Sequence, residues 1–583
     1  MENVTLKING MEVSAPKGST ILEAARLAHI EIPTLCFLKE INEIGACRIC
    51  VVEVKGARSL VASCVYPVAE GMEVWTNTPK VLDSRKKTLQ LLLSNHDRKC
   101  LSCVRSGNCE LQQLAKELGV EDESYYDGDK TPSCIDDSAA HMLRDNSKCI
   151  LCRRCVAVCE NVQGIGVIGA NERGFHTNIG SAFEMGLGET SCVSCGQCIA
   201  VCPTGALTEK SCIDDVLAAI HDPSKHVIVQ TAPAVRAGLG EEFGYPIGTD
   251  VEGKMAAALR RIGFDKVFDT DFSADLTIME EAHEFIHRVQ NNGVLPLITS
   301  CSPGWVKYCE HYFPDMTENL SSCKSPQQMF GAVMKTYFAK KLDVSPEQIF
   351  TVSVMPCVAK KGEREMELFY EEYAGHDIDV VITTRELVKM IRSAHISPDT
   401  LQDIESDRPM QQGSGAGVIF GVTGGVMEAA LRTAYYLLKK ENPPADAFKA
   451  VRSPAFQANE GVAEADFTID NITVKTAVVS GLSNTRKLLG KIERGEVHYD
   501  FVEVMACPGG CVGGGGQPIH DGEERAFERG GNLYRLDETA AIRFSHENPD
   551  IMQMYDEFFE KPLSHKAHML LHTEHGKQDD TEA

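Results

Sequence analysis

The sequence predicts a multidomain protein of the mixed α+β and α/β class, with small cysteine-containing domains followed by a large C-terminal α/β domain. Most of the 23 cysteines lie in closely spaced groups before residue 210. From residue 226 onward, apolar runs of strand length alternate with helical segments, a pattern typical of parallel sheets with helices on their faces. The 583 residues are enough for about four domains of ordinary size.

Composition restricts the possible partners and the compartment. The net charge of −25 argues against nucleic acid and anionic membranes as partners. No run of about 18 apolar residues is present, which argues against a membrane span. The first thirty residues lack a basic start, an apolar segment and a twin arginine, so we predict a cytoplasmic location. In that reducing compartment, the cysteines are expected to bind metal rather than form disulfides.

Residues 1–78 are predicted to form a β-rich domain that carries a [2Fe–2S] cluster. Alternating apolar residues around Asn9-Gly10 indicate a hairpin, and a helix is expected after Ser19 or Thr20. Strands are expected at 51–54 and 60–63. Four cysteines follow the spacing C-x₁₀-C-x₂-C-x₁₃-C, namely Cys36, Cys47, Cys50 and Cys64. Four thiolates on loops suit a [2Fe–2S] cluster, with zinc as the alternative. The module resembles the β-grasp domain of plant-type ferredoxins and of complex I subunits.

Residues 79–118 are predicted to form a small second cluster domain. A helical stretch at 81–93 is followed by one histidine and three cysteines, namely His96, Cys100, Cys103 and Cys109. One imidazole and three thiolates this close together can hold zinc or a [4Fe–4S] cluster, and we predict the cluster. Residues 119–138 are acidic and rich in turn formers, so we interpret them as a linker in which Cys134 is a free thiol.

Residues 139–210 carry the pattern of a bacterial two-cluster ferredoxin. The run C-x₂-C-x₂-C-x₃-C occurs twice, and in such domains the fourth cysteine of each run ligates the other cluster. One [4Fe–4S] cluster is therefore assigned to Cys149, Cys152, Cys155 and Cys202, and the other to Cys192, Cys195, Cys198 and Cys159. The chain thus has four predicted electron carriers before residue 210, and such a chain of carriers needs a terminus.

Residues 211–583 are predicted to form the C-terminal α/β domain. Strands are expected at 226–230, 294–298, 350–354, 378–382, 476–480 and 499–504, and helices include 254–262, 324–341 and 426–440. Ligands of parallel sheets bind beyond the carboxyl ends of the strands. Cysteines occupy three of these ends, namely Cys301, Cys357 and the pair Cys507 and Cys511.

The last pair lies in the glycine-rich stretch 504–518, where a helix is excluded and close backbone approach is possible. A thiolate pair with nearby backbone N–H groups suits an iron–sulfur cluster. The alternative is a surface loop with two incidental cysteines.

Several motifs resemble those of [FeFe]-hydrogenases. TSCSPGW at 299–305, VMPCVAKK at 354–361 and EVMACPGGCVGGGGQP at 503–518 are similar to the three signature motifs of that family, and the segments 379–387 and 415–427 also match. The resemblance covers essentially the whole chain and is strongest to the catalytic subunit of multimeric NAD(P)-linked, electron-bifurcating hydrogenases. It implies reversible H₂ oxidation at an H-cluster, a [4Fe–4S] cubane joined through a cysteine to a diiron unit with CO, CN⁻ and a bridging dithiolate.

The resemblance also implies roles for individual residues of the C-terminal domain. Cys357, Cys507 and Cys511 would bind the cubane, with Cys511 as the bridging thiolate. Lys360 would pair with a cyanide, whereas its neighbour Lys361 is expected to be exposed. The remaining pocket residues would be Ala232, Pro233, Gln327, Met355, Phe420 and Met505. Protons would pass from a cysteine thiol to Glu281, Ser321 and Glu284; without the resemblance, these glutamates would be interpreted as a solvated helix face.

One departure from the family pattern concerns Cys301 and Ser302. The family has adjacent cysteines there, the first relaying protons and the second ligating the cubane, and a serine hydroxyl is a poor ligand for a soft site. Two interpretations follow. In the one we favour from sequence, Cys301 ligates the cubane and Cys323 donates the proton. In the other, Ser302 ligates and Cys301 relays.

The sequence also bears on partners and on alternative functions. No G-x-G-x-x-G motif follows a strand into a helix, so flavin and NAD(P) chemistry is assigned to partner subunits of a hetero-oligomer, with ferredoxin as a further electron partner. A non-catalytic electron-transfer or sensory homologue and a stand-alone ferredoxin-dependent hydrogenase are the alternatives. The tail after about residue 572 is predicted to be disordered and to carry no further cluster.

Overall fold

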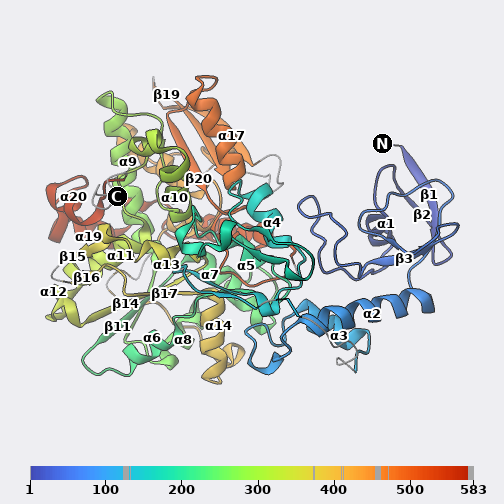
Figure 1. Ribbon diagram of the computed structural model, residues 1–583. Helices are drawn as coiled ribbons and strands as arrows, with labels where there is room; N and C mark the ends of the chain where they lie inside the picture. The colour runs from blue at the N-terminus through green and yellow to red at the C-terminus, as the bar shows by residue number, and fades with distance from the viewer. Residues whose placement is uncertain are drawn as a thin grey trace. The chain divides into compact units, whose positions relative to one another are not determined.

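The computed structural model describes residues 2–121, 130–131, 133–371, 374–408, 410, 413–444, 446–452, 461–469, 472–520 and 522–575. The chain forms two compact units (Figure 1). The first comprises Met1–Asn161, Gly166–Thr190 and Val201–Thr208, and the second comprises Val162–Ile165, Ser191–Ala200 and Glu209–Ala583.

The first unit begins with a five-stranded sheet in the order β2-β1-β5-β3-β4. Its strands are β1 (Asn3–Ile8), β2 (Met11–Pro16), β3 (Val51–Val54), β4 (Val61–Ala62) and β5 (Glu73–Trp75). Strands β1 and β2 form the predicted hairpin around Asn9 and Gly10. Helix α1 (Ile21–Leu27) begins after Thr20, whose hydroxyl accepts from the Glu23 backbone N–H while the Glu23 carboxylate accepts from the Thr20 N–H. This reciprocal cap satisfies two N–H groups that the helix leaves unpaired.

Two longer helices and short strands complete the first unit. Helix α2 (Pro79–Asn95) covers the predicted 81–93 stretch, and α3 (Glu110–Glu117) follows the cysteine group. Strand β7 (Met142–Asp145) lies between β6 (Ile135–Asp136) and β10 (Leu207–Glu209) in a small sheet, and β8 (Gly169–Asn171) pairs with β9 (Asn178–Gly180). The segment 119–138, interpreted as a linker, contains strand β6, which pairs with β7. Residues 122–129 and 132 of that segment are outside the described residues.

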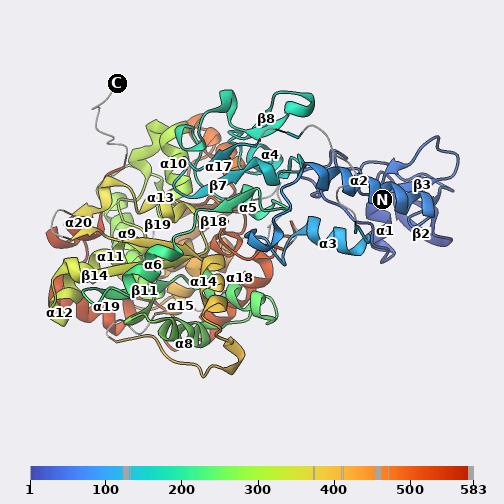
Figure 2. The same ribbon diagram turned by 60° about the horizontal axis from the view of Figure 1, so that its bottom comes forward.

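A four-stranded parallel sheet in the order β12-β11-β14-β17 organises one half of the second unit. Strands β11 (His226–Thr231), β14 (Ile349–Met355) and β17 (Val380–Thr383) were predicted, and β12 (Lys266–Asp269) was not. Helices α8 (Glu252–Ile262) and α14 (Thr384–Ser393) pack against each other and against this sheet, and both views show them together (Figures 1 and 2). All positions of β17 are buried, as expected for a strand covered on both faces.

A second sheet, in the order β13-β20-β19-β18, organises the other half. In Figure 1 its strands β19 and β20 lie in the upper part of this unit, and β11, β14 and β17 lie in the lower part. Strands β13 (Leu297–Ile298), β20 (Phe501–Met505) and β19 (Ile472–Ser480) are parallel. Two predictions are corrected here. The expected strand 294–298 is shortened, because Pro296 has no N–H to donate to the ladder. Strand β18 (Val462–Ile469) runs antiparallel to β19, so this sheet is mixed.

Helix α9 (Thr270–Gln290) is the longest helix of the second unit among the described residues, and it packs against α11 (Pro326–Val333), α15 (Gly415–Val418) and α16 (Gly425–Lys439). The predicted helix 324–341 is interrupted, because residues 334–338 form a π-helical segment between α11 and α12 (Ala339–Leu342). The shorter helices that border the sheets are α6 (Ile213–Ile220), α7 (Pro233–Gly238), α10 (Pro303–Tyr312), α13 (Ala359–Glu363) and α17 (Leu482–Glu493).

The C-terminal segment contains α18 (Ala526–Thr539), α19 (Pro549–Met554) and α20 (His565–Leu571). It is anchored on α9, where buried Asp275 accepts hydrogen bonds from Ser545 Oγ at 2.7 Å and Asn548 Nδ2 at 2.8 Å. Residues just beyond 572 are also held, since the Thr573 N–H donates to the Ser322 carbonyl at 2.7 Å. The predicted disorder therefore does not begin at 572, and residues 576–583 lie outside the described residues.

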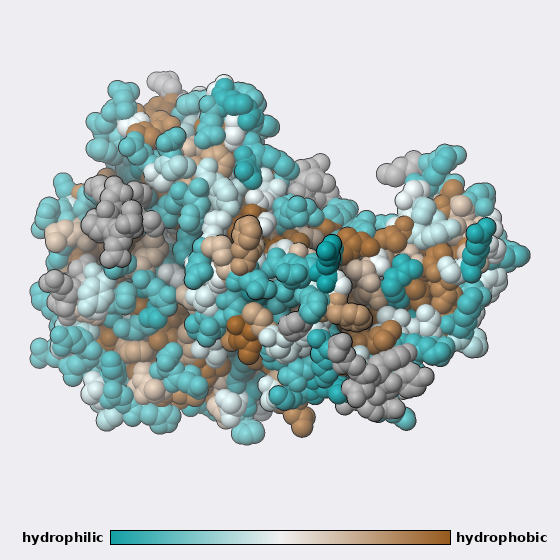
Figure 3. All heavy atoms as spheres, viewed as in Figure 1, coloured by the Kyte–Doolittle hydropathy of each residue, from teal (hydrophilic) through white to brown (hydrophobic). Residues whose placement is uncertain are grey.

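Within the described ranges, no helix combines the length and apolar character that crossing a membrane requires. The face of the second unit seen in Figure 3 is predominantly hydrophilic, with smaller hydrophobic areas between polar ones.

Candidate active site

A cavity with about 850 Å³ of empty space, its opening included, lies in the second unit where loops from both sheets meet. Its walls come from the loops that follow the carboxyl ends of β11, β13, β14 and β20, together with residues of α9, α11 and the segment 415–421. The predicted residues that line it are Ala232, Pro233, Cys301, Ser302, Gln327, Met355, Cys357, Lys360, Phe420, Met505, Cys507 and Cys511. Parallel strands therefore deliver residues distant in sequence to one point, as their shared polarity requires.

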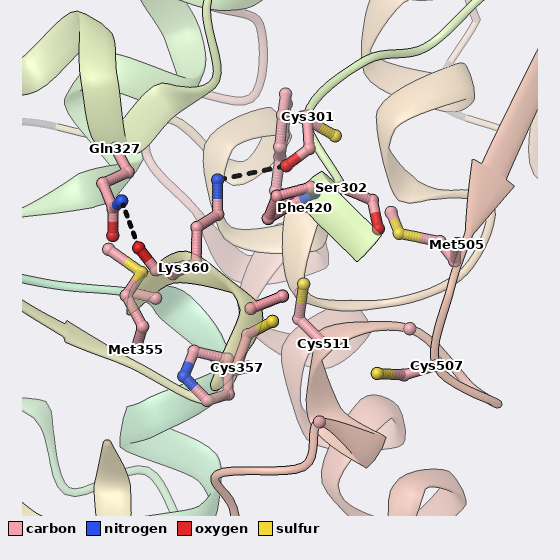
Figure 4. Close-up of a pocket in the computed structure, with 18 of the residues that line it drawn as sticks. Cys301, Ser302, Gln327, Met355, Cys357, Lys360, Phe420, Met505, Cys507 and Cys511 are labelled. Atoms are coloured by element: carbon pink, nitrogen blue, oxygen red, sulfur yellow. Dashed lines mark hydrogen bonds between the residues drawn. The ribbon is translucent and has the colours of Figure 1, made fainter. Parts of the chain in front are cut away.

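Cys357, Cys507 and Cys511 gather on one side of this cavity (Figure 4). Cys357 follows β14, and the other two follow β20. Burial raises the pKa of all three thiols, that of Cys511 to about 12. Three buried thiols can ionise together only if a positive centre compensates their charge, and a metal cluster supplies such a centre.

The glycines around Cys511 are required by their protein neighbours. A Cβ at Gly514 would lie 2.2 Å from the Pro356 carbonyl oxygen, and one at Gly515 would lie 2.6 Å from the Cys195 carbonyl oxygen. Such contacts are shorter than real Cβ atoms make. The close backbone approach expected from the sequence is therefore an approach to two other loops, which holds the cysteine-bearing loops against each other.

Lys360 and Gln327 place polar groups at the cavity. The Lys360 ammonium is buried and donates to the Cys301 carbonyl at 3.1 Å and to both Glu363 carboxylate oxygens at 3.0 and 2.9 Å. Gln327 Nε2 donates to the same carboxylate at 2.9 Å, and among the described residues Gln327 Oε1 has no hydrogen-bond partner. The Lys360 ammonium is a hydrogen-bond donor at an otherwise apolar wall and suits a small anionic or polar diatomic ligand, whereas the free Gln327 Oε1 can only accept a hydrogen bond.

The expectation that Lys361 is exposed is wrong. Its side chain is buried and its ammonium donates to the Val381 carbonyl at 2.9 Å and to Glu386 at 3.1 Å. Lys361 points to strand β17, whereas Lys360 points to the cavity, because adjacent residues of a helix lie on different faces. Lys361 thus fixes α13 to the sheet.

The Cys301 sulfur lies apart from the three gathered sulfurs, and Figure 4 shows it across the cavity from Cys357, Cys507 and Cys511. Burial raises the pKa of the Cys301 thiol, and the nearby Glu281 carboxyl raises it further. Ser302 also lines the cavity, and its hydroxyl makes no capping bond to α10 although it occupies the N-cap position. The direction of the Cys301 side chain does not support the interpretation favoured from sequence, in which Cys301 ligates the cubane.

A line of buried polar groups leads from Cys301 away from the cavity. Burial raises the pKa of Glu281 to about 8, with the Glu284 charge as a smaller cause and a hydrogen bond with Ser321 opposing both. The Ser321 hydroxyl donates to Glu284 Oε2 at 2.9 Å, and Arg288 Nη2 donates to Glu284 Oε1 at 2.6 Å. Glu281 and Glu284 lie on α9, as predicted, but their helix face is buried.

Cys323 is close to this line but not in the cavity. Its thiol donates to Glu284 Oε2 at 3.5 Å, and it lines a separate hollow with Ser300 and His575. Residue 323 is held there because it pairs with His572 in an isolated antiparallel bridge. The predicted role of Cys323 as proton donor at the cavity therefore has no support in this geometry.

A predicted cluster segment borders the cavity within the second unit. Cys195 lines the cavity, and the Cys507 thiol points to its carbonyl oxygen at 4.0 Å. Gln197 Nε2 donates to the Gly513 carbonyl at 2.9 Å, which joins this segment to the glycine-rich loop. An electron carrier held by this segment would therefore lie next to the three gathered thiols.

The first unit brings other predicted ligands together. Cys36, Cys47, Cys50 and Cys64 are buried; the Cys47 N–H donates to Cys36 Sγ at 3.5 Å, and Cys50 Sγ lies 3.3 Å from Cys64 Sγ. Cys149, Cys152, Cys155 and Cys202 line one hollow, which matches the crossed pairing of ferredoxin runs.

His96 belongs to the predicted ligand set that also contains Cys100, Cys103 and Cys109. It is buried, and its Nδ1 has no hydrogen-bond partner among the described residues, so this nitrogen is suited to bind a metal. Cys109 Sγ in the same group contacts the Pro203 carbonyl at 3.6 Å.

Sequence reasoning missed Glu503, a buried carboxylate on β20. It accepts from the backbone N–H groups of Gly424 at 2.6 Å and Met427 at 2.7 Å, at the start of α16. Burial raises its pKa to about 7. This contact positions the segment that carries Phe420. The glutamate in the otherwise apolar run 501–505 could have signalled it, because an acidic residue in a buried strand needs a partner.

The comparisons with known proteins identify the domains of the chain, including the one that contains this cavity. Residues 225–515 match the C-terminal domain of the iron only hydrogenase large subunit, and residues 523–578 match the iron hydrogenase small subunit. In the N-terminal part, residues 1–79 match a 2Fe-2S iron-sulfur cluster binding domain, residues 85–124 the NADH-ubiquinone oxidoreductase-G iron-sulfur binding region, and residues 148–206 a 4Fe-4S dicluster domain. The chain belongs to the [FeFe]-hydrogenases and is an iron hydrogenase, an oxidoreductase acting on H₂, with additional iron–sulfur domains.

Three relatives illustrate the similarity. The chain is 49% identical to the NADP-reducing hydrogenase subunit HndD of Solidesulfovibrio fructosivorans, over 99% of this chain and 100% of that protein. It is 44% identical to iron hydrogenase 1 of Clostridium pasteurianum, over 98% and 100%. The solved structure of [FeFe]-hydrogenase HydA1 from Chlamydomonas reinhardtii is 41% identical, with a TM-score of 0.56, and covers 63% of this chain and 99% of that one.

Proposed function

We propose that the protein is the catalytic subunit of a multimeric, NAD(P)-linked, electron-bifurcating hydrogenase with four accessory clusters, one [2Fe–2S] and three [4Fe–4S]. The observation that carries this proposal is the gathering of Cys357, Cys507 and Cys511 at a cavity that a predicted cluster segment also borders. The similarity to a subunit named NADP-reducing, along nearly the full length of both chains, supports NAD(P)-linked partner subunits, whereas flavin and ferredoxin partners remain predictions from the sequence. The cytoplasmic location remains a prediction from the sequence.

The residues fit an H-cluster. The three thiols would hold its cubane, with Cys511 bridging; Lys360 would donate to a diatomic ligand, and Gln327 would line the same wall. Ala232, Pro233, Met355, Phe420 and Met505 would enclose them. When bound, the cluster would supply the redox chemistry by which H₂ is reversibly oxidised to two protons and two electrons.

The chain's own groups would then separate the products. Cys301 would pass a proton to Glu281, and Ser321 would pass it on to Glu284. The raised pKa of Glu281 keeps this carboxyl protonated near neutral pH, so it can both donate and accept during turnover. We assign Cys301 to this relay and Ser302 to the fourth cubane position, because the Cys301 sulfur is directed away from the three thiols.

Infrared spectroscopy of the matured, anaerobic protein tests the proposal. We expect narrow CO and CN⁻ stretching bands that shift under H₂, in the region where protein groups do not absorb. Matured protein with full iron and sulfide but without these bands would contradict catalysis and favour a non-catalytic electron carrier or sensor. Copurification with flavoprotein subunits would separate the multimeric enzyme from a stand-alone ferredoxin-dependent hydrogenase.

A further inference from the structure

A second group of metal-ligand side chains lies outside the cavity. Glu284, Cys323 and His572 each place one ligand atom within 4.8 Å of the others, and all three residues are buried. They come from α9, from the loop before α11 and from the residue after α20. The β-bridge between residues 323 and 572 fixes two of the three backbones relative to each other. The group is therefore preorganised by the fold.

The donor set is one thiolate, one imidazole and one carboxylate. Zinc accepts this combination in tetrahedral sites, and three protein ligands leave one position for water. A metal-bound histidine usually has an oxygen partner on its second nitrogen. His572 has one on each side, with Ser322 Oγ 2.8 Å from Nδ1 and Glu280 Oε2 3.1 Å from Nε2. Whichever nitrogen binds the cation, the other keeps a partner that orients the ring.

An exposed histidine lies next to the group. The rings of His568 and His572 are 4.4 Å apart, one exposed on α20 and the other buried beside it. Adjacent imidazoles, one accessible to solvent and one buried, offer a cation a route from the surface to the inner ligands. A cation held there would be directly beside Ser321, which donates to Glu284 at 2.9 Å.

We propose that Glu284, Cys323 and His572 form an inhibitory zinc site on the proton route. The inhibitory part rests on the proposed function, in which Glu284 is the last buried carboxyl of the relay. Bound Zn²⁺ would use the Glu284 lone pair that Ser321 now contacts, and its positive charge would oppose the approach of a proton. Binding releases the Cys323 thiol proton to solvent, so the site exchanges protons for the cation.

Zinc uptake by the matured, anaerobic protein tests the site itself. After incubation with zinc chloride and desalting, we expect one added zinc per chain with iron unchanged, measured by mass spectrometry of the metals. Zinc-edge X-ray absorption should show sulfur at about 2.3 Å and nitrogen or oxygen at about 2.0–2.2 Å. Zinc without sulfur scattering, or no retained zinc, would overturn the proposal.

Matched variants locate the site. Cys323→Ala and His572→Gln should each weaken zinc binding by roughly tenfold or more, because losing a ligand costs at least as much as losing an outer-shell partner. Cys134→Ala, which removes an exposed thiol elsewhere, should bind zinc like the native protein. Equal uptake by all variants would mean adventitious binding and would contradict the site; their iron content reports whether they are folded.

Activity then tests inhibition. Zinc should lower H₂ oxidation by the native protein at least tenfold, a chelator should restore it, and Cys323→Ala should lose the zinc response. Zinc bound at these residues without loss of turnover would contradict inhibition. A protein without any H₂ turnover would instead contradict the proposed function, and its zinc uptake would still decide the site.

Discussion

The two sides of the cavity are built from different kinds of sequence. On the thiol side, Cys357, Cys507 and Cys511 lie on loops that directly follow buried parallel strands. On the proton side, Glu281 lies in the middle of a long helix and Ser321 in a loop between α10 and α11. The thiol side uses short motifs with fixed spacing, because its loops and strands are contiguous in sequence. The proton side exists only after three distant segments have packed, so no local pattern marks it.

Under the proposed function, this difference would give the two products, protons and electrons, separate exits. Cys195 and Gln197 bring a predicted cluster segment to the thiol side, whereas Ser321, Glu284 and Arg288 lead away from the other side. Separation matters because a proton and an electron that leave by one route can recombine there. The strongest test of this comparison is to substitute a residue on one side of the cavity and to measure whether the function of the other side is retained.

The largest expected effect is that of Glu281→Gln. The amide fills the same space but cannot exchange a proton, so H₂ turnover should fall by about 10²–10⁴-fold, the usual contribution of a positioned acid–base group. The iron content and the infrared bands should match those of the native protein, because the thiol side is untouched. Activity within a factor of three of the native value would refute the relay.

Variants of Cys301 and Ser302 test which of these two residues relays protons and which ligates the cubane. Cys301→Ala should lower turnover about as much as Glu281→Gln while retaining iron, since its sulfur is directed away from the gathered thiols. Ser302→Ala should instead make the cubane lose iron faster to a chelator, followed by absorbance and iron analysis. If Cys301→Ala loses iron and Ser302→Ala does not, Cys301 is the ligand, as the sequence alone favours.

The smallest expected effect is on stability. The pKa of Glu281 is about 8 in the folded protein and near 4.5 for an ordinary glutamate. Between these two pH values, the folded state therefore holds a proton that the unfolded state has released. The contribution of the neutral carboxyl to the free energy of unfolding is complete below about pH 4.5. It decreases by about 1.4 kcal/mol per pH unit as the pH rises from there to about 8. From pH 5.5 to 7.5 the native melting temperature should therefore fall relative to that of Glu281→Gln, measured by calorimetry. Parallel curves would contradict a buried, neutral Glu281.

The positions of Cys357, Cys507 and Cys511 after long apolar runs predicted from sequence that they could meet, and the same pattern also included Cys301. Their ligand roles and the whole proton side came only from the family resemblance. The sequence could not show that Lys361 is buried or that β18 runs antiparallel, since both depend on which element packs nearby. It also could not orient Cys301, because rotation about one backbone segment decides whether a side chain faces the thiols or Glu281.

The most direct test of the account is whether H₂ reduces the accessory clusters. Anaerobic, matured protein would be exposed to H₂ and frozen, and its clusters followed by electron paramagnetic resonance, with dithionite as the reference reductant. The account predicts cluster signals under H₂ that approach those with dithionite, and their absence in Cys511→Ala, which lacks the proposed bridging thiol. Signals with dithionite but none with H₂, in protein that carries the full infrared bands, would contradict an electron exit through the thiol side.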